Sequence, residues 1–263
     1  MKIGIFDSGL GGLIITHALT KDLPEYDYVY LGDTARVPYG NRTQTEIYQF
    51  TKEAMEFLFS KDCKLAIVAC NTASAEALRK IQQQFVPQKW SDRKVLGVLI
   101  PSAEEAVVIG KRIGVIATQA TIDSGAFDRE LLKLNSEIEI IKKATPLLVP
   151  IIEEGDIKKA KRVLSEYLAD IKNEIDTLIL GSTHYARLKN EAQQIVGKGI
   201  TIISQDSVIP MKLKDYLVRH PEIEKSLSKN IRREYFVTKE TAASELLAQE
   251  LMGEVVDLKQ VNL

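Results

Sequence analysis

Small polar and nucleophilic side chains stand at the ends of several short apolar runs in this sequence. The residues concerned are Asp7-Ser8, Asp33-Thr34, Cys70-Asn71-Thr72 and Ser182-Thr183-His184. Each apolar run is rich in β-branched residues, which predicts a buried strand that ends at the polar residue. Ligands of open α/β sheets bind outside the carboxyl ends of the strands, so these residues are candidates for a substrate site.

Cys70 carries the most nucleophilic side chain among these candidates. A helix is expected to begin directly after it, and the free N–H groups and dipole of a helix N-terminus favour a thiolate. We therefore expect the pKa of the Cys70 thiol to lie below its ordinary value of about 8.5. The segment alone is equally consistent with a small buried residue at a tight turn, with Asn71 and Thr72 as helix caps.

The glycine-rich segment 7–12 follows a predicted strand and opens a predicted helix, as dinucleotide-binding loops do. Its spacing is not G-x-G-x-x-G, however, and Asp7 would repel a pyrophosphate. A carboxylate there is better suited to hold an ammonium group or to take part in proton transfer. No G-K-[ST] loop occurs, and His17, His184 and His220 lack metal-ligand spacing. We expect neither a nucleotide nor a structural metal.

Two further positions have both a chemical and a structural interpretation. His184 lies two residues after Ser182 and could act as a general acid or base beside it, although a lone histidine is more often a capping or surface residue. Glu153 and Glu154 follow an apolar run, and by themselves they indicate the acidic first turn of a surface helix.

Apolar runs and amphipathic stretches alternate along the chain, which predicts a layered α/β fold. Strands are expected at 3–6, 28–32, 64–69, 94–100, 112–117, 138–142, 176–181, 200–204 and 234–237. Helices are expected over 45–61, 74–85, 156–171 and 241–252. Several strands are apolar on both faces, as in a parallel sheet covered on both sides.

A weak internal repeat points to two similar lobes. Residues 65–72 resemble 177–184, and 3–6 resemble 113–116, so both pairs occur in the same order. A protein of two such lobes would carry its site in the cleft between them.

The composition excludes several classes of protein. Among 263 residues, 45% are hydrophobic and 27% charged, which is typical of a globular chain. The 35 basic and 36 acidic residues nearly cancel, so neither nucleic acid nor a membrane surface is an expected partner. Two cysteines, the absence of a signal-peptide pattern and the absence of an apolar run of about 18 residues favour a cytoplasmic protein.

Six motifs, taken together and in this order, resemble those of the glutamate racemases, within the cofactor-independent aspartate/glutamate racemase superfamily. They lie at 6–13, 32–40, 69–74, 116–121, 150–155 and 180–185 and span nearly the whole chain. The resemblance implies an α/β fold of two pseudo-symmetric lobes, each a mostly parallel sheet flanked by helices, with the site in the inter-lobe cleft. The lobes would comprise 1–97 plus 208–263, and 98–207. It also implies a homodimer, with glutamate as the small-molecule substrate and no cofactor.

The resemblance further assigns roles to individual residues. Cys70 would be one of two groups that exchange the α-proton from opposite faces, with Ser182 at the other position. Asp7 would assist Cys70, while Glu153 and His184 would serve the Ser182 side. The substrate would be held by Asp7, Ser8, Tyr39, Gly40, Asn71, Thr72, Thr118, Thr121, Thr183 and His184.

Ser182 is a departure from the family pattern, which has a second cysteine there; Thr145 replaces another family-typical cysteine and Ala186 a proline. A serine hydroxyl is a far weaker acid than a thiol, so we expect racemisation to be impaired. The function expected is interconversion of L- and D-glutamate for peptidoglycan synthesis, cell wall biogenesis and cell shape. Two alternatives remain: a one-sided decarboxylase, isomerase or eliminase that uses Cys70 alone, and a non-catalytic glutamate-binding protein.

Overall fold

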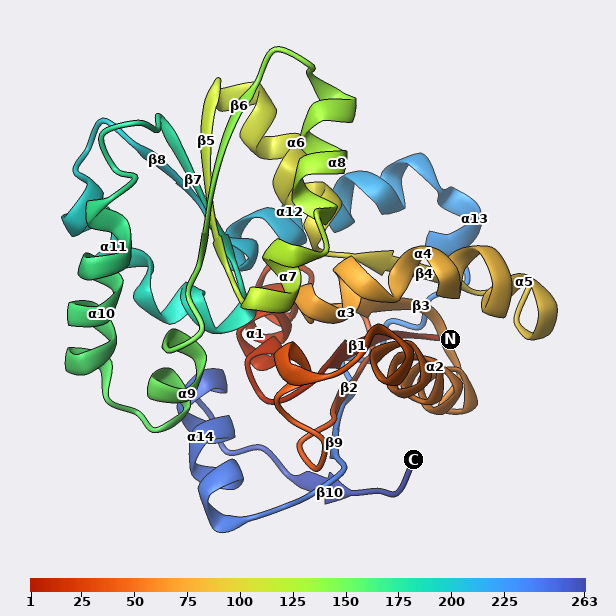
Figure 1. Cartoon of the computed structure of the whole chain (residues 1–263). Helices are drawn as coiled ribbons and strands as arrows, with labels where there is room; N and C mark the ends of the chain where they lie inside the picture. The colour runs from red at the N-terminus through yellow and green to blue at the C-terminus, as the bar shows by residue number, and fades with distance from the viewer. The chain divides into compact units, whose positions relative to one another are not determined.

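A computed structural model describes residues 1–263, and it consists of two compact units (Figure 1). One unit comprises Met1–Val98 and Ile209–Leu263, and the other comprises Leu99–Val208. Each has its own parallel sheet with helices packed against it.

The sheet of the first unit has six parallel strands in the order β10-β9-β2-β1-β3-β4. The strands are β1 (Lys2–Asp7), β2 (Tyr28–Gly32), β3 (Cys63–Val68), β4 (Lys94–Gly97), β9 (Arg233–Val237) and β10 (Leu258–Gln260). The helical segments of this unit are α1 (Gly12–Asp22), η1 (Tyr39–Asn41), α2 (Gln44–Ser60), α3 (Asn71–Glu76), α4 (Leu78–Lys80), η2 (Ile81–Phe85), α5 (Val86–Lys89), α13 (Pro221–Glu224) and α14 (Ala242–Met252). A further helix, α12 (Gln205–Arg219), begins in the second unit and continues into the first.

Both faces of this sheet are buried because successive side chains of a strand point to opposite sides. Ile3 and Ile5 of β1 pack with α1, α12 and α14, whereas Phe6 packs with α2 and α3 on the other face. This explains why the central strands are apolar without interruption.

The second unit has four parallel strands in the order β6-β5-β7-β8. They are β5 (Arg112–Ala117), β6 (Glu139–Ala144), β7 (Thr177–Gly181) and β8 (Thr201–Ile203). The helical segments are α6 (Leu99–Ile109), α7 (Gln119–Asp123), α8 (Ala126–Leu134), α9 (Leu148–Glu153), α10 (Ile157–Ala169), η3 (Thr183–Leu188) and α11 (Lys189–Val196). Side chains of α9, α10, η3 and α11 form one core with β7, and α6 packs against α8 and β7.

The two units share a strand order, which confirms the predicted α/β fold of two similar parallel sheets. In each, the first strand of the unit lies between its second and third strands, and the fourth lies beyond the third. Strand β1 thus corresponds to β5, and β3 to β7. The residues that follow β3 and β7, Cys70 and Ser182, occupy equivalent places in the two sheets.

Three local expectations differ from the structure. The strand expected over 94–100 ends at Gly97, and α6 begins at Leu99 with Pro101 in its first turn, where the missing N–H is tolerated. The helix expected over 74–85 is broken into α3, α4 and η2. Strand β10 was not predicted because two of its three residues are exposed and its pattern is not apolar.

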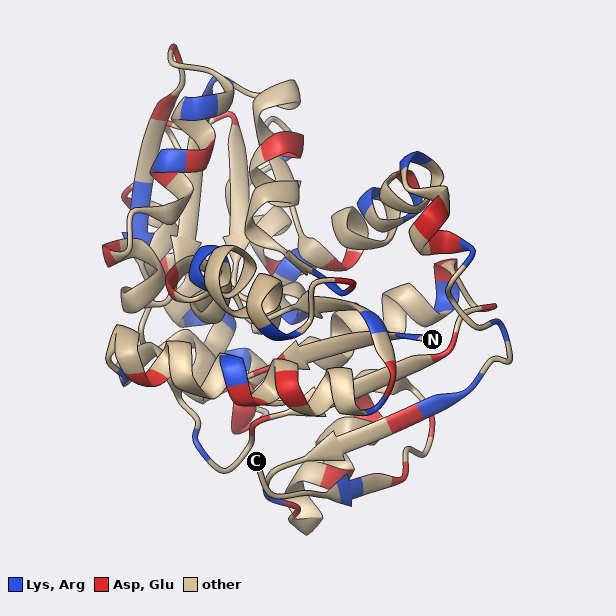
Figure 2. Cartoon of the chain, turned by 90° about the vertical axis from the view of Figure 1, so that its right-hand side faces the viewer, with Lys and Arg blue, Asp and Glu red and all other residues tan.

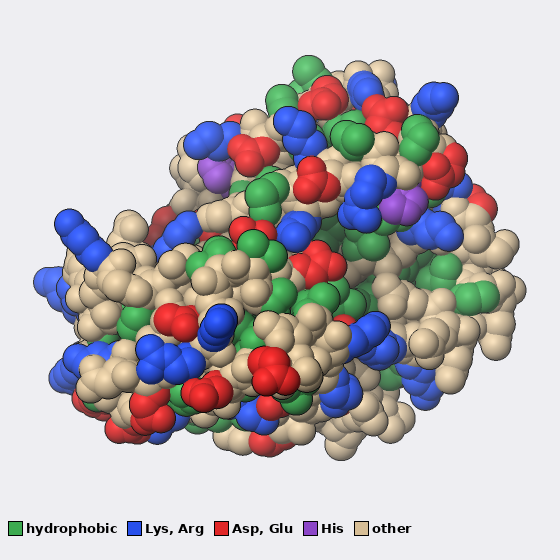
Figure 3. Space-filling view, turned by 90° about the horizontal axis from the view of Figure 1, so that it is seen from above, with side chains coloured by type: hydrophobic (Ala, Val, Ile, Leu, Met, Phe, Trp, Pro, Cys, Tyr) green, Lys and Arg blue, Asp and Glu red, His purple; other side chains and the backbone are tan.

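Charged side chains of both signs are mixed on the surface. Blue stretches (lysine and arginine) and red stretches (aspartate and glutamate) are both scattered over the ribbon in Figure 2, and basic and acidic side chains are interspersed on the face seen in Figure 3. This distribution agrees with the net charge of -1. None of the helices has the length and apolar character needed to cross a membrane.

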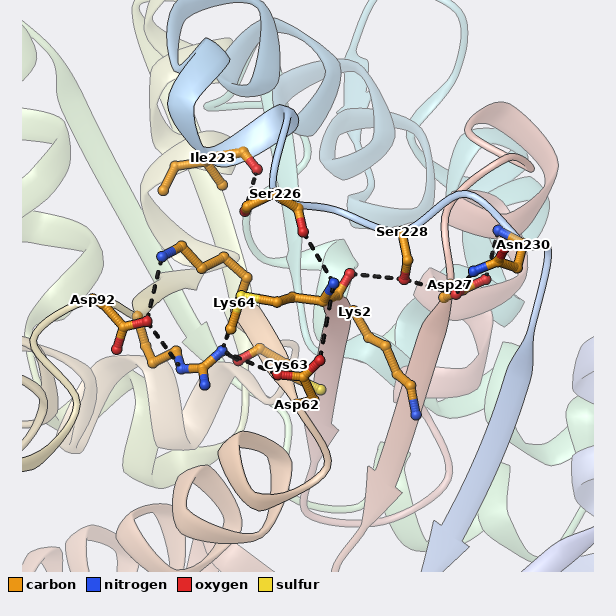
Figure 4. Close-up of polar contacts among 12 residues, drawn as sticks. Lys2, Asp27, Asp62, Cys63, Lys64, Asp92, Ile223, Ser226, Ser228 and Asn230 are labelled. Carbon is orange, nitrogen blue, oxygen red and sulfur yellow. Dashed lines mark hydrogen bonds and ion pairs between the residues drawn. The ribbon is translucent and has the colours of Figure 1, made fainter.

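A buried carboxylate links the start of β2 to the segment that precedes β9 (Figure 4). Asp27 accepts hydrogen bonds from the Ser228 hydroxyl at 2.7 Å, the Asn230 amide side chain at 2.9 Å and the backbone N–H of Arg232 at 2.8 Å. Burial opposes its charge, but these donors prevail and lower the pKa of Asp27 to about 2.

Candidate active site

The loop after β1 packs closely on its neighbours, and this packing places Asp7. A Cβ at Gly12 would lie 2.5 Å from the Asp7 Cβ, and one at Gly32 would lie 2.4 Å from the carbonyl oxygen of Gly9. Glycine is therefore required where α1 and β2 approach this loop. The buried carboxylate of Asp7 accepts a hydrogen bond from the Gly9 N–H at 3.1 Å.

Cys70 lies at the end of β3 and forms the N-cap of α3. Its Sγ accepts a hydrogen bond from the Ala73 N–H at 3.4 Å and lies 3.2 Å from the Ser8 hydroxyl oxygen. Burial, followed by the negative charge of Asp7, raises the pKa of Cys70 to about 11, against the opposing effect of Ser8 and Ala73. The expected lowering of this pKa is thus wrong. The helix start is present, but desolvation and a like charge outweigh it.

Asn71 and Thr72 follow in the first turn of α3, and both side chains are buried. The 3₁₀ turn η1, which carries Tyr39 and Gly40, packs against α3. The first unit therefore brings the following predicted site residues to one edge of its sheet: Asp7, Ser8, Tyr39, Gly40, Cys70, Asn71 and Thr72.

The Tyr39 hydroxyl is held by Asp33, a residue not included among the predicted site residues. It donates to Asp33 Oδ2 at 2.5 Å, and that buried carboxylate also accepts from Arg36 Nε at 2.6 Å and from the Thr238 hydroxyl at 2.8 Å. Burial and then Asp33 raise the pKa of Tyr39 far above its usual range. Asp33 already stood out as a polar strand end, whereas nothing local to Thr238 indicates this contact.

In the second unit, Ser182 follows β7 and is buried. Its carbonyl accepts a hydrogen bond from the Tyr185 N–H at 3.0 Å, at the start of η3. His184 Nε2 lies 3.0 Å from Glu153 Oε1, and His184 Nδ1 lies 3.4 Å from the Thr183 hydroxyl. Both ring nitrogens of the histidine are therefore oriented by neighbouring oxygens.

Glu153 is the last residue of α9, so the surface helix start expected from the sequence is wrong. The next helix, α10, begins at Ile157 and is capped by Asp156, which accepts from the Lys159 N–H at 2.9 Å. Of the two adjacent glutamates, Glu153 is the one that contacts His184.

A buried contact between Thr145 and Tyr185 holds η3, the segment that carries Thr183 and His184, in place. Their hydroxyl oxygens are 2.6 Å apart, both side chains are fully buried, and the Thr145 N–H donates to the Ala117 carbonyl at 2.9 Å. This contact ties η3 to the ends of β5 and β6. From the sequence, Thr145 is notable only as a replacement of a family-typical cysteine, and no local signal indicates its contact with Tyr185.

Thr118 directly follows β5, and Thr121 lies in the helix α7 that begins after it. Thr118 caps α7 by accepting from the Thr121 N–H at 3.4 Å, and their hydroxyl oxygens are 3.0 Å apart. Strand β5 ends just before Thr118, and the equivalent strand β1 ends just before Ser8. A hydroxyl side chain therefore follows the equivalent strand in each of the two sheets.

Comparisons with known proteins identify the family of this chain. A model of the Asp/Glu/hydantoin racemase family matches residues 14–208. The chain belongs to this family. Among its relatives, the glutamate racemase of Aquifex aeolicus (strain VF5) is 46% identical over 82% of this chain and 84% of its own.

Solved structures give the same result. The glutamate racemase isoform RacE1 of Bacillus anthracis superposes with a TM-score of 0.90 at 33% identity, covering 100% of this chain and 97% of its own. The glutamate racemase of Francisella tularensis subsp. tularensis SCHU S4, in complex with D-glutamate, superposes with a TM-score of 0.88 at 32% identity, covering 99% and 97%.

Proposed function

We propose that this chain is a glutamate racemase that interconverts L- and D-glutamate by direct proton transfer at the α-carbon. The observation that carries the proposal is the buried Cys70 thiol, in contact with Ser8 and close to Asp7 at the carboxyl ends of β3 and β1. It is supported by membership of the racemase family and by relatives that are glutamate racemases.

In the proposed reaction, the Cys70 thiolate removes the α-proton. The S–H bond forms as the Cα–H bond breaks, and the electron pair stays on the α-carbon next to the carboxylate. The Ser182 hydroxyl then donates its proton to the opposite face of the α-carbon, and His184, which contacts Glu153, returns a proton to the serine oxygen. Because the α-proton is very weakly acidic, the carbanion needs preorganised hydrogen-bond donors.

These donors would come from residues at the strand ends of both units. We propose that the ammonium group and the two carboxylates of glutamate are held by Asp7, Ser8, Tyr39, Gly40, Asn71, Thr72, Thr118, Thr121, Thr183 and His184. In this arrangement the substrate ammonium neutralises the charge of Asp7, and Asp7 then assists Cys70 instead of opposing its thiolate.

The proposal is tested by following the circular dichroism of D- and L-glutamate with purified protein. We expect slow racemisation, a large gain in Ser182→Cys because a thiol ionises far more readily than a hydroxyl, and loss in Cys70→Ala. If neither the parent nor Ser182→Cys racemises glutamate, the assignment fails.

Ser182 favours a second candidate, a one-sided reaction at Cys70 alone. Exchange of solvent deuterium into a single enantiomer, without inversion, would support this one-sided chemistry. A non-catalytic glutamate-binding protein is the remaining alternative. Calorimetric binding of glutamate without any exchange, even in Ser182→Cys, would support it.

The biological role, the oligomeric state and the location of this protein stay predictions. Under the proposed function, D-glutamate would supply peptidoglycan synthesis, and so cell wall biogenesis and cell shape. The protein would be a homodimer and would work in the cytoplasm. Sedimentation of the purified chain tests the oligomeric state.

A further inference from the structure

The contact between Ser8 and Cys70 has a direction that depends on the state of the thiol. The Ser8 Oγ and Cys70 Sγ atoms are 3.2 Å apart, and either can donate while the sulfur carries its proton. A thiolate has no proton, so only the serine hydroxyl can then donate. The backbone N–H groups of Ala73, at 3.4 Å, and of Ser8 also donate hydrogen bonds to the sulfur, which suits an anionic sulfur.

The other titratable groups that face Cys70 within its unit do not provide positive charge. Asp7 opposes the thiolate. Tyr30 and Tyr39 have pKa values raised well above their usual range by burial, so they stay neutral at physiological pH. Their hydroxyls donate elsewhere, to the Gly9 carbonyl at 2.7 Å and to Asp33 at 2.5 Å. The Ser8 hydroxyl and the backbone N–H groups of Ser8 and Ala73 stabilise the thiolate instead.

We propose that Ser8 is a catalytic residue on the Cys70 side, whose hydroxyl donates a hydrogen bond to the thiolate and so makes this sulfur available as a base. The inference deepens the proposed racemase function and rests on it. In the step concerned, the proton passes from the substrate α-carbon to Sγ, and Ser8 keeps its own proton throughout. This role is separate from any contact of Ser8 with the substrate.

The test measures the thiol directly in the ligand-free protein. In a Cys63→Ala background, where Cys70 is the remaining cysteine, the ultraviolet absorbance of the thiolate is titrated for Ser8→Ala and for Ser8→Thr. We expect Ser8→Ala to raise the pKa of Cys70 and to slow alkylation by iodoacetamide about tenfold at a fixed pH, the change that one pKa unit gives. Ser8→Thr retains the hydroxyl, so its thiol should titrate as it does in the parent.

The kinetic counterpart is the pH profile of kcat/KM for glutamate. Its rising limb reports the essential base of the free enzyme, so it should shift to higher pH in Ser8→Ala and stay in place in Ser8→Thr. A role limited to packing would lower the unfolding temperature without moving this limb. Ser8→Gly is a second hydroxyl-free variant for use if Ser8→Ala does not fold.

An unchanged thiol titration in both hydroxyl-free variants would overturn the inference. Failure of the proposed function has a different signature. In that case the parent and Ser182→Cys would be inactive towards glutamate, whatever the thiol titration of the Ser8 variants shows.

Discussion

The Cys70 thiol shows how strongly one side chain depends on its surroundings. A helix start and the hydrogen-bond donors of Ser8 and Ala73 favour its thiolate, while burial and the Asp7 carboxylate oppose it, and the opposing effects prevail. The same helix-start position on an exposed surface would favour the thiolate. A ligand that changes the solvation of the Cys70 sulfur or neutralises the charge of Asp7 should therefore change the ionisation of this thiol.

This environment predicts a thiol that is unreactive at neutral pH. Because the pKa of Cys70 is about 11, alkylation of the ligand-free protein should be slow at pH 7 and rise steeply towards pH 11. Asp7→Asn removes the like charge and should lower the pKa of Cys70. Titration of the thiolate absorbance measures the pKa of Cys70 in the parent and in Asp7→Asn. Both proteins carry Cys63→Ala, which removes the second thiol, whose pKa burial raises to about 12. Rapid alkylation of Cys70 at pH 7 would contradict the prediction.

At the level of secondary structure, the ends of the strands and the starts of the helices build the candidate site. Helix α1 can begin directly beside Asp7 because residue 12 has no side chain. In the second unit, the buried Thr145–Tyr185 contact holds η3 against the ends of β5 and β6. Such close packing determines where the polar strand ends lie.

Gly12→Ala should therefore disturb both stability and the site. The added Cβ would lie 2.5 Å from the Asp7 Cβ, so backbone must shift, and we expect a loss of about 1–3 kcal/mol in the free energy of unfolding. Gly199→Ala is the matched control, since its Cβ would meet nothing within 4 Å. Denaturant titration measures both. Equal stability of the two variants would show that the α1 loop adjusts without strain.

On the scale of the whole molecule, the first unit is assembled from two distant parts of the chain. Strand β9 joins the sheet beside β2, and Asp27 and Asp33, at the two ends of β2, contact the segments before and after β9. The C-terminal residues 209–263 are thus needed to complete the sheet that carries Cys70. They also hold the Asp33 carboxylate, which accepts the hydrogen bond from Tyr39.

Asp27 predicts how the stability of this unit depends on pH. Its pKa is about 2 in the folded protein against an ordinary 3.8, so its ionised form stabilises the fold. That contribution, about 2 kcal/mol, is fully present above about pH 4 and is lost as the pH falls from 4 towards 2.

Asp27→Asn should accordingly lower stability at pH 7 and flatten the acid side of the stability profile. The exposed Asp92, 3.4 Å from Lys64, is the control, and Asp92→Asn should change stability little. Unfolding titrations across the acid range measure both variants. A parallel loss at pH 3 and pH 7 would show that the charge of Asp27 does not carry the effect.

Local patterns were enough to predict the parallel strands and the polar residues at their ends, with Cys70 after one strand and Ser182 after another. This is because apolar runs and their flanking residues are short-range properties of the sequence. The contacts that place and tune those residues could not be predicted in this way. Thr238 meets Asp33 across 205 positions of sequence, and Ser228 meets Asp27 across 201. The direction of the Cys70 pKa shift likewise depends on burial, which exists only once the chain has folded around the sulfur.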